Sequence, residues 1–457
     1  MKIAIVGGGF VGTAVACQLL QAAPSGSQLT LINAGGQLAR GVAYGTRSAA
    51  HLLNVPAARM GWDVAAPLDF AESLVRRGLS YAQHDFVPRS LYGNYLGETL
   101  QRHIDARCDV GWRHLPASVH DLWRRPDGSW NVVLGDGSSI NADCVILALG
   151  NFAPACPLAD FATLPAHCYA PDPWQSDALA GIDPHARVAI VGSGLTMLDM
   201  LVSLDDAGHC GPIFALSRRG LLPQGHRDNE LPPHQWRPPA GWPRSEGVVP
   251  RSMLRAIRNA VDAARRDDRD WRDIWGAMRA VTPELWRSMS TRDRAQFLRH
   301  LQPLWDVHRH RSAPAALARF ERLRASGRLT QAAGRLVAAR VDEGQVMLEW
   351  RARGDETTRT VRAARVINCS GPSSRIRDDR SGLFGTLEAA GRLQPCPLGL
   401  GVIVDDRYQL LDAQGQAQPG LFYVGPLLKA QYWEATAVPE LRQHAAAAAR
   451  ACLAGMV

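Results

Sequence analysis

Lysine is the scarcest charged residue in this 457-residue sequence, which contains only Lys2 and Lys429. The other 49 of its 51 basic residues (51 − 2) are arginines. A phosphate loop of the Gly-Lys-Ser/Thr type therefore cannot be formed, and Lys429 is the only candidate for Schiff-base chemistry.

Cysteine pairs and long apolar runs are also missing. The nine cysteines are scattered and no two have Cys-x-x-Cys spacing, which argues against a dithiol redox centre or a structural zinc site, so no metal site is expected. No stretch approaches the ~18 apolar residues of a membrane span. Residues 1–6 resemble a buried strand and not a signal peptide, so we expect a cytoplasmic protein with reduced thiols and no membrane contact.

A glycine-rich turn follows the first predicted strand, residues 3–6. Gly7, Gly9 and Gly12 have the Gly-x-Gly-x-x-Gly spacing, and a helical pattern follows. These glycines permit a tight turn, close approach of a pyrophosphate and close packing of the helix, whose N-terminus attracts phosphate. Asn33 stands after the next strand, where an acid usually binds ribose hydroxyls, and an amide can also hydrogen-bond a hydroxyl. The pattern predicts dinucleotide binding.

A second unit of the same kind begins at Val188. The strand 188–191 leads into Gly192, Gly194 and Thr196, but Met197 occupies the position of the third glycine, so this helix must pack farther from its strand. Two such units predict two bound nucleotides.

Arg218 and Arg219 follow the next strand of the second unit. Arginine at this position can hold the 2′-phosphate of NADPH, which narrowly favours NADPH over NADH. The alternative is two surface arginines in an arginine-rich chain.

The order of these motifs predicts an α/β protein with two nested Rossmann-like units, the arrangement of a two-dinucleotide flavoprotein. Strands ending in glycine recur at 143–150, 365–371 and 420–425, each placing a glycine where a strand meets a ligand. We predict an outer FAD-binding domain from 1–160 and 331–457, an inner NAD(P)H-binding domain from 161–225, and a helical cap from 226–330. The cap is rich in tryptophan and arginine, which can exclude water and attract an anion, although these residues can equally fill its own core and surface.

Eight motifs in the expected order resemble the FAD/NAD(P)-binding family of bacterial flavoproteins, distant relatives of the amine N-hydroxylases. They are Gly41–Thr46, His51–Pro56, Phe86–Leu96, Gly192–Asp199, Ser217–Gly220, Phe297–His300, Arg309–Arg311 with Pro314, and Trp433–Glu440. The activity that this resemblance implies is hydroxylation of a small planar anion with NAD(P)H and O2, with urate and its conversion to 5-hydroxyisourate in purine catabolism as the first hypothesis.

The resemblance implies that FAD binds Gly7, Gly9 and Gly12, and that the loop crossing toward the flavin ring carries Gly41, Tyr44 and Asn54. Gly371 and Gly425 would lie at the other end of the cofactor. Many flavoproteins have an acid after the last glycine to hold the ribityl chain, whereas this chain has Pro426, which leaves a backbone group or Asp405 for that role.

Two groups of residues are candidates for contact with substrate. His310 and Glu434 are the candidate catalytic residues, since an imidazole can move a proton and an acid before the last helix can face the flavin. Forked guanidinium donors at Arg309 and Arg311 suit a planar anion, and Arg89 and Tyr92 of the third motif are further substrate-binding candidates. For Glu434 the alternative is a carboxylate stabilised by the start of a helix.

Other classes of protein remain open. An amine N-hydroxylase, a flavin dehydrogenase or an NAD(P)H oxidase needs the same two nucleotide units. A dithiol reductase shares the nesting but needs the absent Cys-x-x-Cys pair. A nucleic-acid-binding flavoprotein would explain the net charge of +8, but a pocket for a small anion requires fewer assumptions, so no nucleic-acid partner is expected. The sequence does not predict an oligomeric state.

Overall fold

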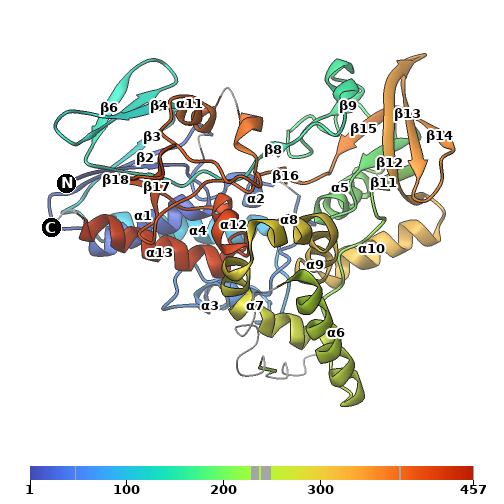
Figure 1. Ribbon diagram of the computed structural model, residues 1–457, viewed down its shortest axis with the longest axis horizontal. Coiled ribbons are helices and arrows are strands. Elements are labelled where there is room, and N and C mark those ends of the chain that lie inside the picture. The colour runs from blue at the N-terminus through green and yellow to red at the C-terminus, as the bar shows by residue number, and fades with distance from the viewer. Residues whose placement is uncertain (36, 47, 228–235, 238–248, 380–381, 456–457) are drawn as a thin grey trace.

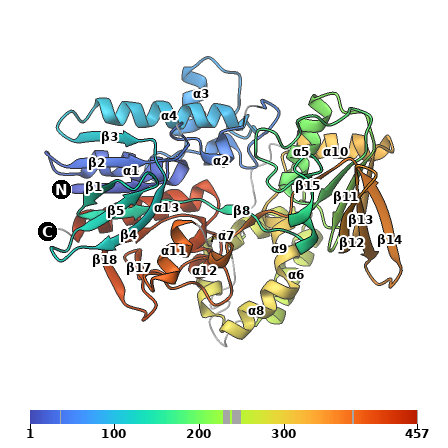
Figure 2. The same cartoon turned by 90° about the horizontal axis from the view of Figure 1, so that it is seen from above.

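The computed structural model describes residues 1–35, 37–46, 48–227, 236–237, 249–379 and 382–455 (Figure 1). Its two large sheets lie in two units side by side, and a group of helices lies between and below them (Figures 1 and 2). Both ends of the chain are in the first unit. The expected α/β class with parallel sheets is confirmed.

The sheet of the first unit is parallel except for its edge strand β17. In spatial order its strands are β17 (Gln409–Leu411), β18 (Ala417–Tyr423), β7 (Cys144–Leu147), β1 (Lys2–Val6), β2 (Gln28–Ile32) and β3 (Gly111–Leu115). Ile3 and Ile5 face one side of the sheet, and Ala4 and Val6 face the other, all of them buried. An apolar run without polar alternation forms such a strand because both faces of a parallel sheet are covered.

Different layers cover the two faces of this sheet. One face packs on α1 (Phe10–Ala22), α4 (Arg89–Asp105) and α13 (Val438–Ala454). The other packs on a three-stranded sheet of β4 (Val119–Arg124), β5 (Trp130–Leu134) and β6 (Ser139–Ala142), together with α11 (Leu383–Ala389). The shorter helices of this unit are α2 (Gly41–Tyr44), η1 (Ala57–Arg59), α3 (Asp69–Arg76), η3 (Ile376–Asp379), η4 (Pro426–Leu428) and α12 (Lys429–Tyr432).

The sheet of the second unit has parallel strands at its centre. Its order is β14 (Thr358–Ala363), β13 (Gln345–Ala352), β12 (Leu329–Asp342), β11 (Ile213–Ser217), β10 (Val188–Val191), β15 (Arg365–Asn368) and β9 (Tyr169–Ala170). Helices α5 (Leu195–Asp206) and α10 (Pro314–Ala325) pack on one face, and η2 (Ala159–Thr163) contributes to the core on the other.

The strands from 329 to 368 lie in this second sheet, whereas the sequence-based division assigned residues from 331 onward to the first unit. The difference has a physical cause. β15 and β7 are both short buried strands followed by small residues, so their sequences do not say which sheet each joins; pairing of β15 with β10, with Asn368 beside Val191, decides it. The chain returns to the first unit through β16 (Pro372–Ser373), which pairs with β8 (Phe152–Pro154).

The described residues between β11 and α10 form four helices. They are α6 (Pro250–Arg266), α7 (Trp271–Ser288), α8 (Thr291–His300) and α9 (Gln302–Arg309). Trp286, Phe297 and Trp305 from these helices pack in one apolar cluster with Leu400 and Trp433 of the first unit. The insertion thus begins and ends at the second unit but buries its apolar face against the first. Among the described residues, no helix has the length and apolar character needed to cross a membrane.

Candidate functional site

The first glycine turn lies at the carboxyl end of β1, between β2 and β7. A Cβ on Gly7, whose φ is +112°, would lie 2.6 Å from the carbonyl oxygen of Ala148. A Cβ on Gly12 would lie 1.8 Å from the carbonyl oxygen of Gly7. Gly9 caps α1 in an extended conformation without a side-chain cap, so the first N–H groups of the helix are left for a phosphate.

A cleft of about 300 Å³ opens beside this turn. It is lined by the ends of β1, β2 and β7, by the segment after β3, and by residues near η3 and α11. The side-chain oxygen of Asn33 accepts a hydrogen bond from the Gly8 N–H at 3.2 Å, and its amide donates to the carbonyl of Gln37 at 3.3 Å. Asn33 therefore shapes the turn while lining the cleft. Bare glycine, open helix N–H groups and a cleft at the strand ends fit the pyrophosphate and adenosine parts of FAD.

The segment expected to cross toward the flavin contains the short helix α2, and most of this helix is exposed. Gly41 has φ +54°, and its Cβ would lie 3.2 Å from the Cα of Gly9, so this loop closely approaches the phosphate turn. The Tyr44 ring meets Tyr92 edge-on at 4.7 Å. Farther along, the carbonyl of Asn54 is 3.0 Å from Nε2 of His226, at the start of the helical insertion.

The two glycines expected at the far end of the cofactor both have positive φ, +91° at Gly371 and +156° at Gly425. A Cβ on Gly425 would lie 2.7 Å from the carbonyl oxygen of Leu149. Asp405 uses its carboxylate within its own turn, where it accepts from the N–H groups of Arg407 and Gln409 at 2.9 and 2.7 Å.

The second glycine turn repeats the first at the end of β10. Gly192 has φ +115°, and its Cβ would lie 2.1 Å from the carbonyl oxygen of Cys369. Gly194 caps α5 in an extended conformation, with no atom within 4 Å of a Cβ, and Thr196 follows in the first turn. The Ser193 hydroxyl donates to the Leu221 carbonyl at 2.6 Å and lies 2.7 Å from the Ser217 hydroxyl. These features fit a second dinucleotide phosphate.

The two arginines after β11 differ in their surroundings. Arg219 donates to the backbone carbonyls of Arg299 and His300 at 2.6 and 2.9 Å, which binds the end of α8 to the second unit. The Arg218 side chain is exposed. Arg218 is therefore the one of the two that is open to a 2′-phosphate.

Glu434, Arg309 and Trp305 form a buried group where the helical insertion meets the first unit. Glu434 accepts from the Trp305 indole N–H at 3.0 Å and forms an ion pair with Arg309 at 2.8 Å. Arg309 also lies 3.6 Å from Glu440, which accepts from Arg279 at 2.6 Å. Burial alone would raise the pKa of Glu440, but the hydrogen bond and charge of Arg279 hold it below its ordinary value. The candidate catalytic acid and one candidate substrate arginine thus pair with each other.

The backbone before Glu434 is strained. Trp433 has φ +57° and ψ −54°, and the Glu434 N–H donates to the carbonyl of Tyr432 at 2.6 Å, which closes a γ-turn. A left-handed conformation is costly for a bulky residue, and such strain persists where the surroundings enforce it. Here the Trp433 ring stacks on Trp286 at 4.7 Å, and Lys429 lies 4.3 Å above it. This packing directs Glu434 into the protein.

Arg311 and His310 follow Arg309 at the end of α9. Burial, and then the charge of Arg309, lowers the pKa of Arg311 to about 10, and its Nε has no hydrogen-bond partner among the described residues. Burial lowers the pKa of His310 to about 4, against the smaller opposing effect of Asp306. The His310 ring is therefore neutral at pH 7.

Arg89 and Tyr92, the remaining substrate candidates, are committed to contacts within the protein. Arg89 forms a 2.8 Å ion pair with Asp199 of α5 and donates to the Leu52 carbonyl at 3.0 Å. Beside it, His51 lies 2.8 Å from the Ser203 hydroxyl. Burial raises the pKa of Asp199, opposed by Arg89 and His51. This group joins the two units. Tyr92 is fully buried among Phe10, Tyr44, Phe70 and Tyr95.

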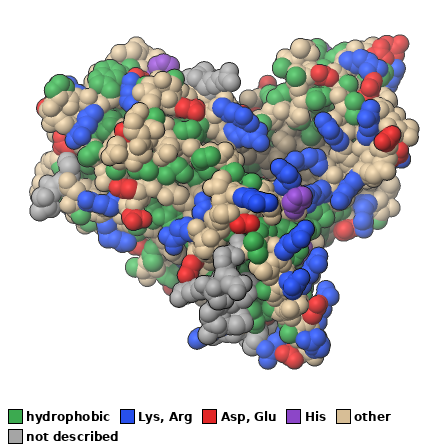
Figure 3. All heavy atoms as spheres, viewed as in Figure 1, with side chains coloured by type: hydrophobic (Ala, Val, Ile, Leu, Met, Phe, Trp, Pro, Cys, Tyr) green, Lys and Arg blue, Asp and Glu red, His purple; other side chains and the backbone are tan. Residues whose placement is uncertain are grey.

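Sequence reasoning did not find Asp199, Arg279 and Glu440 of these networks, nor Arg59, which ends η1 and interacts electrostatically with Arg279, Arg309 and Glu440. Asp199 and Glu440 end two of the quoted motifs, which was an available signal. Arg59 and Arg279 carry no local signal in a chain so rich in arginine. Lys and Arg side chains gather between the two units and over the helical insertion (Figure 3).

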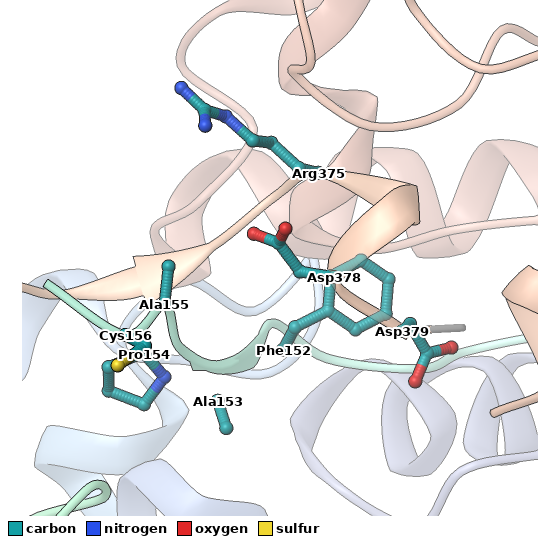
Figure 4. Close-up of a pocket in the computed structure, with 8 residues that line it drawn as sticks. All are labelled: Phe152, Ala153, Pro154, Ala155, Cys156, Arg375, Asp378 and Asp379. Carbon is teal, nitrogen blue, oxygen red and sulfur yellow. The ribbon is translucent and has the colours of Figure 1, made fainter. Parts of the chain in front are cut away.

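A second hollow of about 590 Å³ adjoins the paired connecting strands β8 and β16 (Figure 4). Phe152 to Cys156 line it from one connection, and Arg375, Asp378 and Asp379 from the other. Asp378 accepts a hydrogen bond from Ser373 at 2.6 Å. This second hollow shares Phe152 and Asp379 with the cleft beside Gly7, so the two hollows are neighbours.

Comparison with known proteins supports these assignments. Residues 4–152 match a family model described as FAD-NAD(P)-binding, which confirms the dinucleotide-binding character expected of the first unit. No curated protein gives a significant match to the sequence.

Three solved structures resemble the whole chain. L-lysine 6-monooxygenase from Pseudomonas syringae is 15% identical, with a TM-score of 0.67 over 100% of this chain and 99% of that one. The FAD-bound cadaverine monooxygenase of Erwinia amylovora is 12% identical, with 0.66 over 99% and 94%. Ornithine N-hydroxylase of Kutzneria sp. 744, in complex with reduced FAD, NADP+ and L-ornithine, is 12% identical, with 0.64 over 100% and 99%. At these identities the likeness establishes a shared fold.

Proposed function

We propose that this protein is an FAD-dependent monooxygenase that uses NADPH and O2 to hydroxylate a small molecule. The observation that carries the proposal is the pair of equivalent glycine turns, at Gly7 and Gly192, in a chain that shares its whole fold with flavin-dependent hydroxylases. When bound, FAD and NADPH supply hydride transfer and reaction with oxygen. The chain supplies binding, orientation and exclusion of water.

Each unit has a distinct part in this proposal. The turn at Gly7 and the cleft beside it hold the FAD phosphates and adenosine, and the turn at Gly192 holds the phosphates of NADPH with Arg218 nearby. The buried rings of Trp286, Phe297 and Trp305 keep water from one side of the junction. Glu434, fixed by Arg309 and Trp305, and neutral His310 are the groups there that can hold or move a proton.

Amine N-hydroxylation is the first candidate reaction, because the similar structures are named as hydroxylases of lysine, cadaverine and ornithine. Urate hydroxylation, the first hypothesis from the sequence, gains no support from these structures and becomes the second candidate. It retains the resemblance of the eight motifs and the excess of arginine near Glu434.

The test is NADPH consumption by the purified FAD-containing protein with ornithine, lysine, cadaverine and urate. We expect one of these substrates to accelerate NADPH oxidation, with hydroxylated product formed in step with it. If hydrogen peroxide accounts for all the NADPH consumed with every compound, the protein is an NADPH oxidase and the proposal is wrong.

A further inference from the structure

The arginines around Glu434 and Glu440 outnumber the acids. The positive charges of Arg279, Arg309 and Arg311 all act on Arg59, and that of Arg309 acts on Arg311, while Glu440 opposes this repulsion at Arg59 and Asp270 opposes it at Arg311. Arg309 and Arg279 are the two that ion-pair with the glutamates. Within the described part of the chain, neither Arg59 nor Arg311 forms a salt bridge.

The two unpaired guanidiniums lie beside the loop that is expected to reach the flavin. Arg59 ends η1, five residues after Asn54, and Arg311 follows α9. The ring of His226 joins the two segments, since it bonds to the Asn54 carbonyl at 3.0 Å while Arg311 and Arg59 both act on it. After burial, these charges help to lower the pKa of His226 to about 3.

We propose that Arg59 and Arg311 bind the carboxylate, or an equally planar single negative charge, of the substrate. This inference rests on the proposed function, because it places the ligand next to the expected flavin. A guanidinium presents forked N–H donors that match a planar anion with two acceptors. Nε of Arg311 is a buried donor with no acceptor among the described residues, and an anion would satisfy it and offset the repulsion among these arginines.

The charge of the site predicts which compounds it rejects. Desolvation, and then Arg279, lowers the pKa of Arg59 to about 10, so Arg59 and Arg311 both remain charged at pH 7. Lysine and cadaverine differ only by the carboxylate, and urate is a planar monoanion at neutral pH. The site therefore favours lysine or urate over cadaverine, which carries only positive charge.

The experiment uses the FAD-containing protein and the variants Arg59→Gln and Arg311→Gln. Arg255→Gln is the control, because it removes one positive charge from α6, at a position as exposed as Arg59 but outside the proposed site. The thermal unfolding midpoint is measured with lysine, cadaverine or urate, and kcat/KM is measured for each compound that is turned over. Flavin absorbance verifies that every variant retains FAD.

We expect lysine or urate, but not cadaverine, to raise the midpoint of the parent and of Arg255→Gln. Both site variants lose this increase, and their kcat/KM for the anion falls ten- to a hundredfold, as is typical for loss of a charge-assisted hydrogen bond. Comparing lysine with urate shows whether the site binds a carboxylate or the urate anion. Failure of lysine and urate alike to stabilise the parent, equal stabilisation by cadaverine, or persistence of the anion effect in both variants overturns the site.

The measurements distinguish failure of the anion site from failure of the proposed monooxygenase function. If an anion stabilises the parent through Arg59 and Arg311 but no compound is hydroxylated, the site stands and the monooxygenase proposal fails. If lysine and cadaverine are hydroxylated with equal kcat/KM, the monooxygenase proposal stands and the anion site is wrong.

Discussion

The two glycine turns of this protein use the same backbone geometry with different side chains. Gly7 and Gly192 have φ of +112° and +115°, and each abuts the carbonyl after a neighbouring strand, Ala148 in the first unit and Cys369 in the second. In the first unit Asn33 bonds to the backbone of the turn, and in the second Ser193 bonds to Ser217. The backbone path is thus the shared requirement, and different polar contacts can stabilise it.

The two units differ in the residue at the third glycine position of the motif. A Cβ on Gly12 would collide with the Gly7 carbonyl, whereas Met197 is accommodated and fully buried in the core under α5. The glycine at this position serves helix packing, and the second glycine serves access of the phosphate. A missing third glycine therefore leaves the phosphate position open.

The largest effect is expected from Gly9→Leu. Gly9 has φ −81°, and its Cβ would lie 3.7 Å from the nearest atom, the Cα of Gly41, so the variant can fold. The leucine side chain fills the phosphate position, and the protein should purify without FAD. The ratio of flavin to protein absorbance measures this. Full FAD content in the variant would show that the first turn does not bind the cofactor.

Gly194→Leu is the matched change in the second unit, where a Cβ meets nothing within 4 Å. We expect this variant to keep its FAD, while KM for NADPH rises on the order of a hundredfold. Stopped-flow measurement of flavin reduction tests it, with dithionite reduction as the control. Loss of FAD here, or unchanged reduction by NADPH, would contradict the division of labour between the turns.

Arg89→Met should destabilise the contact between the units. Its ion pair with Asp199 is buried, with 14% and 10% of the two side chains exposed, and removal of one partner of a buried pair typically costs about 3–5 kcal/mol. The control Arg340→Met removes the surface pair with Glu349 and should cost about 0–1 kcal/mol. Denaturant unfolding compares them. Similar losses would mean that Arg89 contributes no more than a surface charge.

The smallest effect is expected on stability when the pH is lowered. The pKa of His226 is about 3 in the folded protein and near the ordinary 6.5 when unfolded, so only the unfolded chain gains this proton as the pH falls below 6.5. Stability should therefore decrease from pH 6.5 toward pH 3, and His226→Asn should decrease less steeply. Unfolding midpoints at pH 7.5 and 5.5 measure the slope. Equal slopes would exclude His226 as a contributor.

Local patterns in the sequence predicted the elements that depend on neighbouring residues. The strand, glycine turn and helix at residues 3–20 and at 188–206 form as expected, because each combines an apolar run, a required glycine and a helical pattern within one short segment. Such patterns also predicted a mainly helical segment at 226–330, and the described part of it contains the helices from α6 to α10.

Contacts between distant segments could not be predicted in this way. Placement of 329–368 in the second sheet depends on strand pairing over long separations, and the pairing of Glu434 with Arg309 depends on how the insertion packs against the first unit. Arg89 was recognised as belonging to a motif, but its motif gives no sign of Asp199, 110 residues away. The part of the insertion at 228–235 and 238–248 lies outside the described residues.

The helical insertion restricts how the two nucleotide units can move. Its two ends are connected along the chain to β11 and α10 of the second unit, while its apolar side packs against Trp433 and Leu400 of the first unit. A hinge rotation of one unit against the other would shear this tryptophan-rich contact and pull directly on the turn that aims Glu434. We therefore expect the insertion to act as a tether that resists changes in the distance between the two glycine turns.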